Sequence, residues 1–487
     1  MKTTFLVISM LLIVFYSCNK TSQPVVAGPT PNPKPDSIAT SLPDSVISIS
    51  IDQTKTSYSI PSTFQGLSYE MDLPINDSAY LNTRNTVLVQ LLKNLGTGVL
   101  RFGGNMSDAV SWSSAPRTSS TPAKTLTPTE VDNISAFAKA VGWKVLFGLN
   151  MGVYNPTLAA NEASYVVNSF KDNLLAIQFG NEPDGYHSWN PVRTSTYGEP
   201  DFETQWNNYF AAVRGQVPGA SLGGPDVAYL SSWVASFATN QASNVKLLTA
   251  HYYQNGPASD ASINVSSLFT PIPQYTNYFQ VINNAALSSG VPWRITECNS
   301  INGGGKYGVS DVFGSTLWAL DFMWQVAINN GQGVNFHGGD GGAYSPIVFY
   351  SKNTTVRPLY YSFLAFKYGT DNSIIVPTTF NATPKYKCSA YACKKLGATV
   401  PVITLINKEF TQNLTFKIQL TNKATTIHIA RLSASSINAT TGVTFCKSAV
   451  NSNGTFQVGS TEDIAVGGLT SFYVTIPKAS AAVVTVE

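Results

Sequence analysis

The sequence LLAIQFGNEPDGYH, residues 174–187, combines a short apolar run with a polar turn that carries a carboxylate. The run from Leu174 to Phe179 has the length of a buried strand and is too short for most helices. The turn that follows places Asn181 and Glu182 directly after that strand. The sequence PWRITE, residues 292–297, repeats the pattern and ends at Glu297. We interpret both segments as strands that end in functional side chains.

Six further segments show the same pattern, and stretches long enough for a helix separate them. Short buried strands that alternate with helices predict an α/β fold, and eight such units predict a closed (β/α)8 TIM barrel. We place this barrel at residues 61–356. Its strands are expected in FQGLSYE (64–70), GVLRFGG (98–104), WKVLFGLN (143–150), LLAIQFGNE (174–182), SLGGPD (221–226), VKLLTAHYY (245–253), PWRITE (292–297) and GVNFHGG (333–339).

The pattern changes after Arg357 to alternating apolar and polar residues with frequent turn signals. ATVPVITLIN (398–407) and NLTFKIQLTN (413–422) are examples. Such alternation predicts half-buried strands, so we expect an antiparallel β-sandwich domain at residues 357–487. VISISID, at the start of segment 45–60, has the same alternation before the barrel begins. We expect this N-terminal strand to complete the sandwich.

The first 17 residues resemble a secretory signal peptide, because Lys2 precedes an apolar run from Phe5 to Tyr16. Cys18 follows directly, which is similar to a bacterial lipoprotein signal that acylates this cysteine. Residues 18–44 are rich in proline and would then form the lipid anchor and an extended linker. We expect an exported lipoprotein, periplasmic or at the cell surface, that contacts the membrane only through its anchor. The alternative is an ordinary signal peptide and a secreted protein.

Composition excludes some partners and cofactors. Only 12% of the residues are charged and the net charge is +3, so no basic surface is expected to bind nucleic acid. The four histidines, His187, His251, His337 and His428, lack the spacing of known metal motifs, so no metal and no cofactor are expected.

The nearest cysteines, Cys388 and Cys393, would form a structural disulfide or remain buried thiols.

Glu182 and Glu297 end the fourth and seventh predicted strands. The ends of these two strands face each other across the opening of a closed barrel, so the two carboxylates can act on one bond. Cleavage of a glycosidic bond with retention needs this pair at roughly 5–5.5 Å, one to protonate the departing oxygen and one to attack the sugar. Asn181 could bond the 2-hydroxyl of the sugar.

The predicted sixth strand ends in two tyrosines, of which only one can point into the barrel. The sequence leaves the choice between Tyr252 and Tyr253 open, and we select Tyr253 as the hydroxyl that would keep a nucleophilic carboxylate ionised. Cys298 follows Glu297 directly, so strand alternation should turn its thiol away from the site. Trp189, together with Asp184 and His187, could line the leaving-group subsite or be part of a surface loop.

Five strings together resemble glycoside hydrolase family 79, the β-glucuronidase and heparanase group. They are GLSYE (66–70), LRFGGN (100–105), FGNEPD (179–184), ITECNSINGGGKYGVSD (295–311) and GVNFHGG (333–339). The resemblance implies that Glu182 is the general acid/base and Glu297 the nucleophile. It also implies a sugar subsite that contains Asn181, Glu70 and Asn105, and a site for the uronic acid carboxylate made by Gly303, Gly304 and Tyr344.

The implied reaction is hydrolysis of a terminal β-linked glucuronic acid with retention, through a covalent glycosyl-enzyme. The expected partner is therefore a β-glucuronide or a glycan that contains glucuronic acid. Two alternatives remain open. The same barrel could cleave another β-glycoside or an internal bond of a polysaccharide, or the chain could be a glycan-binding lipoprotein without catalysis.

Overall fold

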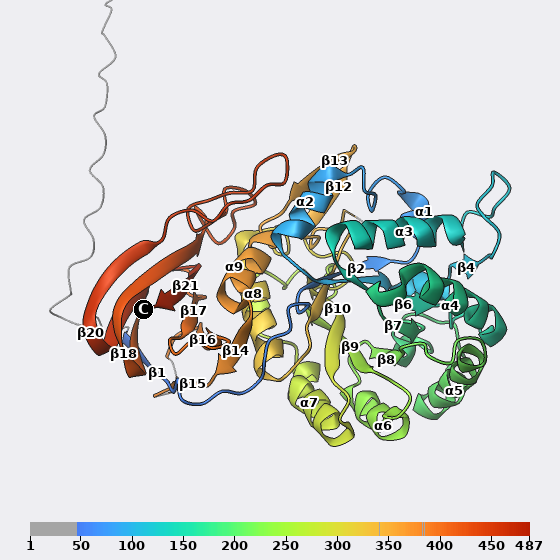
Figure 1. Cartoon of the computed structure of the whole chain (residues 1–487), viewed down its shortest axis with the longest axis horizontal. Coiled ribbons are helices and arrows are strands. Elements are labelled where there is room, and N and C mark those ends of the chain that lie inside the picture. The colour runs from blue at the N-terminus through green and yellow to red at the C-terminus, as the bar shows by residue number, and fades with distance from the viewer. Residues whose placement is uncertain (1–45, 340, 382, 384) are drawn as a thin grey trace, which may run out of the picture. The chain divides into compact units, whose positions relative to one another are not determined.

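The computed structural model describes residues 46–339, 341–381, 383 and 385–487 (Figure 1). The predicted signal peptide, Cys18 and the proline-rich linker lie outside these residues and stay predictions. Within the described part of the chain, none of the helices combines the length and the apolar character needed to cross a membrane.

Eight parallel strands form the central sheet, and each contains or overlaps one of the eight predicted segments. Their order in the sheet is β7-β6-β3-β2-β11-β10-β9-β8, and a bridge between Ile177 and Leu222 joins the two ends. The prediction of a TIM barrel is therefore confirmed. The strands are β2 (Gly66–Glu70), β3 (Val99–Gly103), β6 (Lys144–Leu149), β7 (Leu174–Phe179), β8 (Gly223–Val227), β9 (Leu247–Asn255), β10 (Trp293–Ile301) and β11 (Val334–His337).

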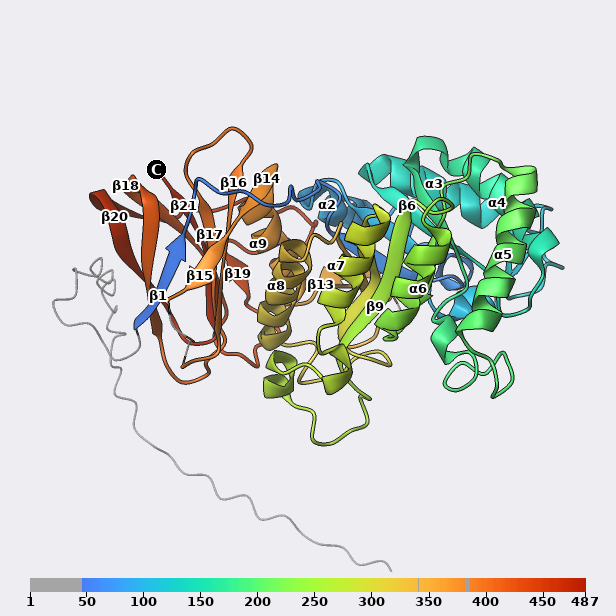
Figure 2. The ribbon, with the colours of Figure 1, turned by 90° about the horizontal axis from the view of Figure 1, so that it is seen from below.

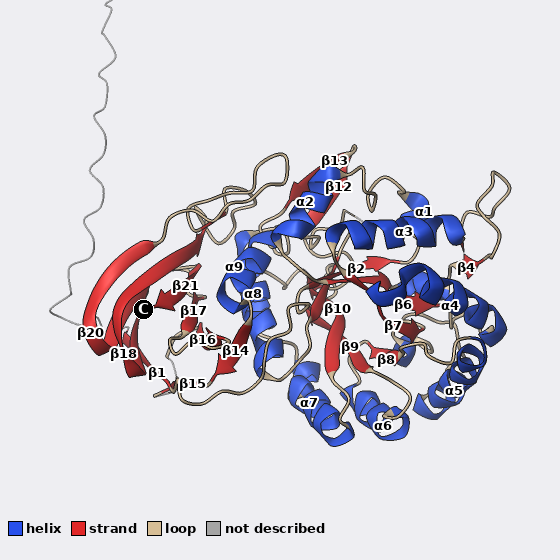
Figure 3. Ribbon diagram, viewed as in Figure 1, coloured by secondary structure: helices blue, strands red, loops and turns tan. Residues whose placement is uncertain are grey.

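Helices surround this sheet (Figure 3). They are α2 (Thr86–Asn94), α3 (Pro128–Val141), α4 (Pro156–Phe170), α5 (Glu199–Gln216), α6 (Ser231–Gln241), α7 (Tyr278–Ser289), α8 (Phe313–Ile328) and α9 (Tyr360–Thr370). Shorter elements line the connections: α1 (Leu73–Asn76), and the small two-stranded sheets β4 (Ser111–Trp112) with β5 (Thr125–Leu126) and β12 (Ile347–Tyr350) with β13 (Asn353–Val356).

Helix α3 shows how local sequence sets these boundaries. The Thr127 side chain accepts a hydrogen bond from the Thr129 N–H, and Glu130 Oε2 accepts one from the Thr127 N–H at 3.0 Å. This reciprocal cap satisfies N–H groups that the first turn leaves without partners. The helix ends at Gly142, whose φ of +73° is accessible to glycine at little cost. The next strand, β6, begins two residues later.

The C-terminal domain is a mixed sheet that includes β1 (Val46–Ile51), as predicted for the N-terminal strand. β1 pairs with β15 (Thr378–Phe380) and with the first half of β18 (Leu414–Ser433). The other strands are β14 (Ser373–Val376), β16 (Cys388–Lys395), β17 (Val402–Asn407), β19 (Thr444–Phe445), β20 (Glu462–Ile476) and β21 (Ser480–Val486).

The expectation of a purely antiparallel domain needs one correction, because β1 runs parallel to β18. A short hairpin forces its two strands to be antiparallel, but more than 350 residues separate β1 from β18 and impose no direction. β18 is long enough to serve both halves of the domain. Its residues 415–420 pair with β1, and its residues 427–432 pair with β21.

Helices α8 and α9 lie between the strands of the barrel and the C-terminal sheet (Figure 2). Trp324 of α8 stacks on Tyr391 of β16 with ring centroids 5.2 Å apart, and the Tyr391 hydroxyl donates to Asp321 at 2.6 Å. Trp318 and Trp324 are both buried, so the expectation that they pack in the core is confirmed. One side of the sheet thus shares an apolar core with the barrel. A second apolar cluster, which includes Ile49 and Phe416, lies within the C-terminal domain.

The cysteines of the described chain, Cys298, Cys388, Cys393 and Cys446, are all free thiols. Cys388 and Cys393 lie on one strand, β16, five positions apart. Side chains at odd spacing point to opposite faces of a sheet, so these two sulfurs cannot meet. Of the two readings that the sequence left open, the disulfide is therefore wrong.

Candidate active site

The carboxylates of Glu182 and Glu297 converge at the carboxyl ends of the barrel strands. One oxygen of each, together with a ring nitrogen of His251, lies within 4.8 Å of the others. Glu182 follows β7 in a left-handed backbone conformation, with φ of +49°, and its N–H donates to the Asp226 carbonyl at 3.0 Å. Glu297 lies in β10, where the register with β9 shifts between Ile295 and Glu297. Such irregularities redirect side chains next to functional sites.

Glu297 is surrounded by hydrogen-bond donors and positive charge. Arg101 Nη1 lies 2.5 Å from its Oε2, and the Tyr253 hydroxyl donates to its Oε1 at 2.7 Å. Nδ1 of His337 lies 3.6 Å from Oε2. Burial alone would raise the pKa of Glu297, but His337, His251, Arg101 and the Tyr253 hydrogen bond lower it to about 2. Glu297 is therefore a carboxylate at neutral pH, which the predicted role of nucleophile requires.

Arg101 on β3 is the central cation of the site and is 1% exposed. Besides Glu297 it binds Asp226 Oδ2 and Asn181 Oδ1, each at 2.7 Å. The guanidinium packs directly against Gly103, where a Cβ atom would lie 2.3 Å from it. A glycine at position 103 thus makes room for the arginine two residues earlier, and the fixed fork of the guanidinium sets the relative positions of three strand ends.

Glu182 has a different set of neighbours. Its Oε1 lies 2.9 Å from His251 Nδ1, and its Oε2 accepts a hydrogen bond from the Trp189 indole at 3.3 Å. His251 Nε2 lies 3.2 Å from Asp226 Oδ1. Burial would lower the pKa of His251, but Asp226 and Glu297 raise it to about 10, and hydrogen bonds to Asp226 and Glu182 add to this. His251 is therefore an imidazolium that donates from both nitrogens.

This protonation state bears on metal binding. Glu182, His251 and Glu297 could each offer one ligand atom to an ion between them. A protonated imidazole has no lone pair for a metal, and the buried guanidinium of Arg101 supplies positive charge at the same place. The residues present suit a network of paired charges better than a metal centre.

The residues expected to bind the sugar lie beside this pair. Asn181 Nδ2 donates to Asn105 Oδ1 at 3.1 Å, so Asn181 connects the guanidinium of Arg101 with the exposed Asn105. Glu70 Oε2 accepts from the Met106 N–H at 2.8 Å, and Glu70 Oε1 lies 3.5 Å from His337 Nε2. The structure thus brings Glu70, Asn105 and Asn181 to one rim of the carboxylate pair.

The two tyrosines at the end of β9 separate as strand alternation requires. The Tyr253 hydroxyl reaches Glu297 inside the barrel. Tyr252 points outward and packs against Tyr275, with ring centroids 4.1 Å apart. Cys298 likewise lies away from the carboxylates, where its thiol approaches the Asn335 carbonyl. The geometry thus selects Tyr253, the choice that the sequence left open, and it agrees with the orientation that alternation predicted for Cys298.

The glycine-rich loop after β10 meets the loop that carries Tyr344. Gly303 and Gly304 have φ of +69° and +91°, and a Cβ atom on either would meet no other atom. Backbone conformation, and not crowding, therefore favours glycine there. The Tyr344 N–H donates to the Gly304 carbonyl at 3.4 Å, and the Tyr344 ring centroid lies 6.3 Å from that of Tyr253. Tyr344 thus borders the site through Tyr253, and it contacts Gly304, the chain neighbour of Gly303.

Sequence reasoning missed four residues of this network: Arg101, Asp226, His251 and His337. Each is a charged or titratable side chain inside or at the end of an apolar strand, which is a signal that the sequence does contain. Of the three residues suggested for the leaving-group side, Trp189 contacts Glu182. Asp184 instead accepts N–H groups of the loop after β8, and no contact to the carboxylates is seen for His187 within the described residues.

Comparison with known proteins gives distant relatives over most of the chain. No family model matches. A β-glucuronidase of Aspergillus niger is 24% identical over 420 residues, which cover 73% of this chain and 77% of that protein. Heparanase-like protein 3 of Arabidopsis thaliana is 22% identical over 383 residues, 72% of this chain and 69% of that protein.

The crystal structure of a 4-O-α-L-rhamnosyl-β-D-glucuronidase from Fusarium oxysporum 12S is similar with a TM-score of 0.74. It is 21% identical in sequence, and the match covers 90% of this chain and 100% of that one. At this identity the likeness shows a common fold.

Proposed function

We propose that this chain, a distant member of the β-glucuronidase and heparanase-like family of glycoside hydrolases, is a retaining enzyme that removes terminal β-linked glucuronic acid. The observation that carries the proposal is the spacing of Glu182 and Glu297, whose nearest oxygens lie within 4.8 Å. Retention needs roughly 5–5.5 Å, whereas inversion needs about 6.5–9.5 Å to admit a water molecule.

The surroundings of the two carboxylates assign the two roles. Glu297 is held ionised by Arg101 and Tyr253 and attacks the anomeric carbon. Glu182 donates its proton to the departing glycosidic oxygen. The bond from sugar to leaving group breaks, and a glycosyl ester forms on Glu297. Water then attacks the same carbon, Glu182 takes its proton, and Glu297 leaves as a carboxylate.

Specificity for glucuronic acid rests on a second set of residues. Glycines with positive φ present backbone N–H groups without a shielding side chain, which suits a carboxylate. Gly303 and Gly304 have this conformation next to Tyr344 and close to Tyr253. Two of the similar proteins are named as glucuronidases. We assign the 6-carboxylate of the sugar to these glycines and Tyr344.

Substitution of each carboxylate tests the catalytic assignment. Glu297→Ala should reduce kcat on an aryl β-glucuronide by about 10⁴-fold or more, because the covalent intermediate can no longer form. Glu182→Gln should reduce it by about 10²–10⁴-fold, because only proton transfer is lost. Asp172→Asn, which changes an exposed carboxylate outside the site, is the matched control. Thermal unfolding checks the fold, and normal turnover of either folded variant would refute the roles.

Proton NMR on several aryl glycosides tests specificity and stereochemistry together. The β-anomer should appear first, and the glucuronide should react faster than the glucoside, which differs only at carbon 6. A preference for the glucoside would exclude the role of Gly303, Gly304 and Tyr344. An α-anomer as the first product would exclude retention.

A further inference from the structure

An exposed indole lies next to the proposed acid. Trp189 is 44% exposed, although it contacts the otherwise buried site through its bond to Glu182 Oε2. The Tyr229 ring lies beside it with a centroid distance of 5.2 Å and an angle of 34° between the planes. Trp189 belongs to the loop after β7 and Tyr229 to the loop after β8. Two barrel loops thus place adjacent aromatic rings at one side of Glu182.

The hydrogen bonds of Glu182 determine which of its oxygens faces the leaving group. His251 donates to Oε1 at 2.9 Å, and the second nitrogen of this ring is held by Asp226. An oxygen that accepts from an imidazolium is the poorer place for a further proton, so the acid role proposed for Glu182 assigns its proton to Oε2. Oε2 is also the oxygen that Trp189 contacts. Whatever is attached to the departing oxygen therefore lies beside the indole.

The carboxylate of Asp184 joins the two loops to each other. Asp184 accepts the N–H groups of Ala228 at 2.9 Å and of Tyr229 at 3.3 Å, which ties the loop of Trp189 to that of Tyr229. Gly185 lies directly under the indole, where a Cβ atom would be 2.1 Å from the ring. The rings are therefore held in place before any ligand binds.

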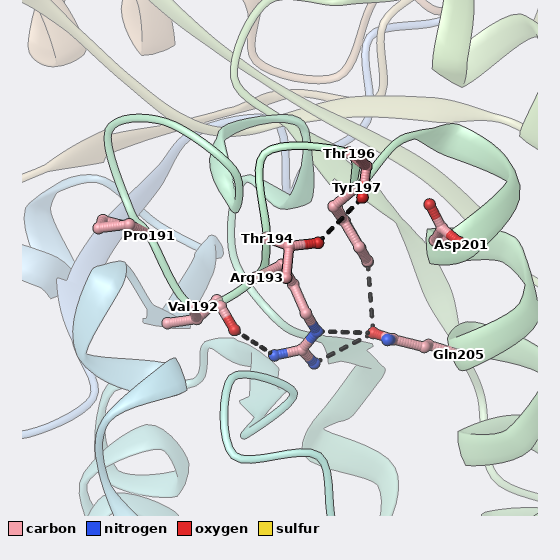
Figure 4. Close-up of a pocket in the computed structure, with 8 residues that line it drawn as sticks. All are labelled: Pro191, Val192, Arg193, Thr194, Thr196, Tyr197, Asp201 and Gln205. Atoms are coloured by element: carbon pink, nitrogen blue, oxygen red, sulfur yellow. Dashed lines mark hydrogen bonds between the residues drawn. The ribbon is translucent and has the colours of Figure 1, made fainter.

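Arg193 anchors the far end of the same loop. It donates to the carbonyls of Met151 and Gly152 at 2.7 Å, and Figure 4 shows it between the Val192 carbonyl and Gln205. Its guanidinium also lies over the Tyr186 ring, 5.5 Å from the centroid. These bonds hold the loop from β7 to α5 against the preceding one.

We propose that Trp189 and Tyr229 form the leaving-group subsite and that they select glucuronides whose leaving group presents a flat ring face. This inference rests on the proposed function, because it needs Glu182 as the acid. Aromatic faces bind other rings through dispersion and apolar contact, whether these are aryl groups or the C–H faces of sugars. An alkyl leaving group without a ring would not use the subsite.

The test measures kcat/KM for three β-glucuronides with different leaving groups: a phenyl group, a second pyranose and a methyl group. Trp189→Ala should lower kcat/KM for the two ring substrates by about tenfold more than for the methyl substrate. Tyr229→Ala should act in the same direction by about threefold. Trp189→Phe keeps a ring but loses the N–H, so it should preserve most of the preference for rings. Tyr350→Ala removes a 79% exposed tyrosine elsewhere and is the matched control.

The outcomes separate this proposal from the function on which it rests. An equal loss on all three substrates in Trp189→Ala would mean that the indole only orients Glu182, and the subsite proposal would fail alone. A wild-type enzyme that cleaves none of the three would overturn the glucuronidase function and the subsite with it. A larger loss on the phenyl than on the disaccharide substrate would support the subsite and assign it to aryl leaving groups, and the reverse would support it and assign it to sugars.

Discussion

The surroundings of Glu297 and Glu182 differ, although both are glutamates at the same end of one barrel. Glu297 meets a guanidinium and a phenol at hydrogen-bond distance, with one imidazole slightly farther away. Glu182 meets one imidazolium and an indole that is open to solvent. These surroundings fit the two proposed roles: the positive neighbours of Glu297 suit a carboxylate that attacks, and the exposed indole beside Glu182 suits a residue next to the leaving group.

The largest effect is expected from removing Arg101, the cation that binds both Glu297 and Asp226. Arg101→Met should leave two buried carboxylates without their main partner and destabilise the fold by about 3–5 kcal/mol. Activity should fall by at least about 10³-fold, because Glu297 and Asn181 lose their orientation. Urea unfolding and kcat/KM measure the two effects.

Arg101→Lys is the conservative control for this substitution. A lysine keeps the charge but cannot form the same fork of bonds, so it should recover part of the stability and little of the activity. An Arg101→Met variant with stability and turnover close to wild type would show that the two carboxylates do not depend on this guanidinium.

A smaller effect is expected when only the hydroxyl of Tyr253 is removed. The Tyr253 hydrogen bond lowers the pKa of Glu297, so Tyr253→Phe should raise that pKa. Glu297 would then become protonated at a higher pH, and the acid limb of the kcat/KM profile should move upward in pH. We expect kcat to fall by about 10- to 100-fold. Tyr252→Phe changes the outward neighbour and should leave the profile in place, and equal shifts in both variants would contradict the geometry.

The smallest effect is expected on the side of Glu182, in the pH dependence of stability. His251 has its pKa raised to about 10 in the folded chain, so its contribution is complete below about 6.5 and is lost as pH rises toward 10. The wild type should therefore lose stability between pH 6.5 and 8.5. His251→Gln should flatten this part of the curve and reduce kcat by about tenfold. Urea unfolding at several pH values measures it, and an unchanged slope would show that His251 is not charged.

Several features could be predicted from the sequence because they depend on local pattern. Strand length and turn residues predicted the barrel. Glu182 and Glu297 were expected at strand ends, and their carboxylates do converge, although β10 continues past Glu297 to Ile301. Even SLGGPD, which has few apolar residues, forms β8. Parity along β9 and β10 distinguishes Tyr253 from Tyr252 and turns Cys298 away, once one inward residue is known.

The network that tunes the pair could not be predicted in the same way. Arg101 joins residues of four different strands or strand ends, and their distances depend on the register and closure of the whole barrel. The pattern of apolar and polar residues within one strand does not determine the register between strands. The direction of β1 escaped prediction for a related reason, since its partner β18 lies at the other end of the chain.

The pairing of β1 with β18 also has a consequence for biosynthesis. β1 is the first described strand to be translated, and residues 415–420, its parallel neighbours, are made after the whole barrel. β1, with isoleucines at positions 47, 49 and 51, therefore lacks its longer neighbour until the end of synthesis. A nascent chain that stops before residue 414 offers it only the short strand β15, which pairs with residues 49–51. Pairing of β1 with β18 is thus a late step of folding, which joins two distant segments after the barrel residues have been made.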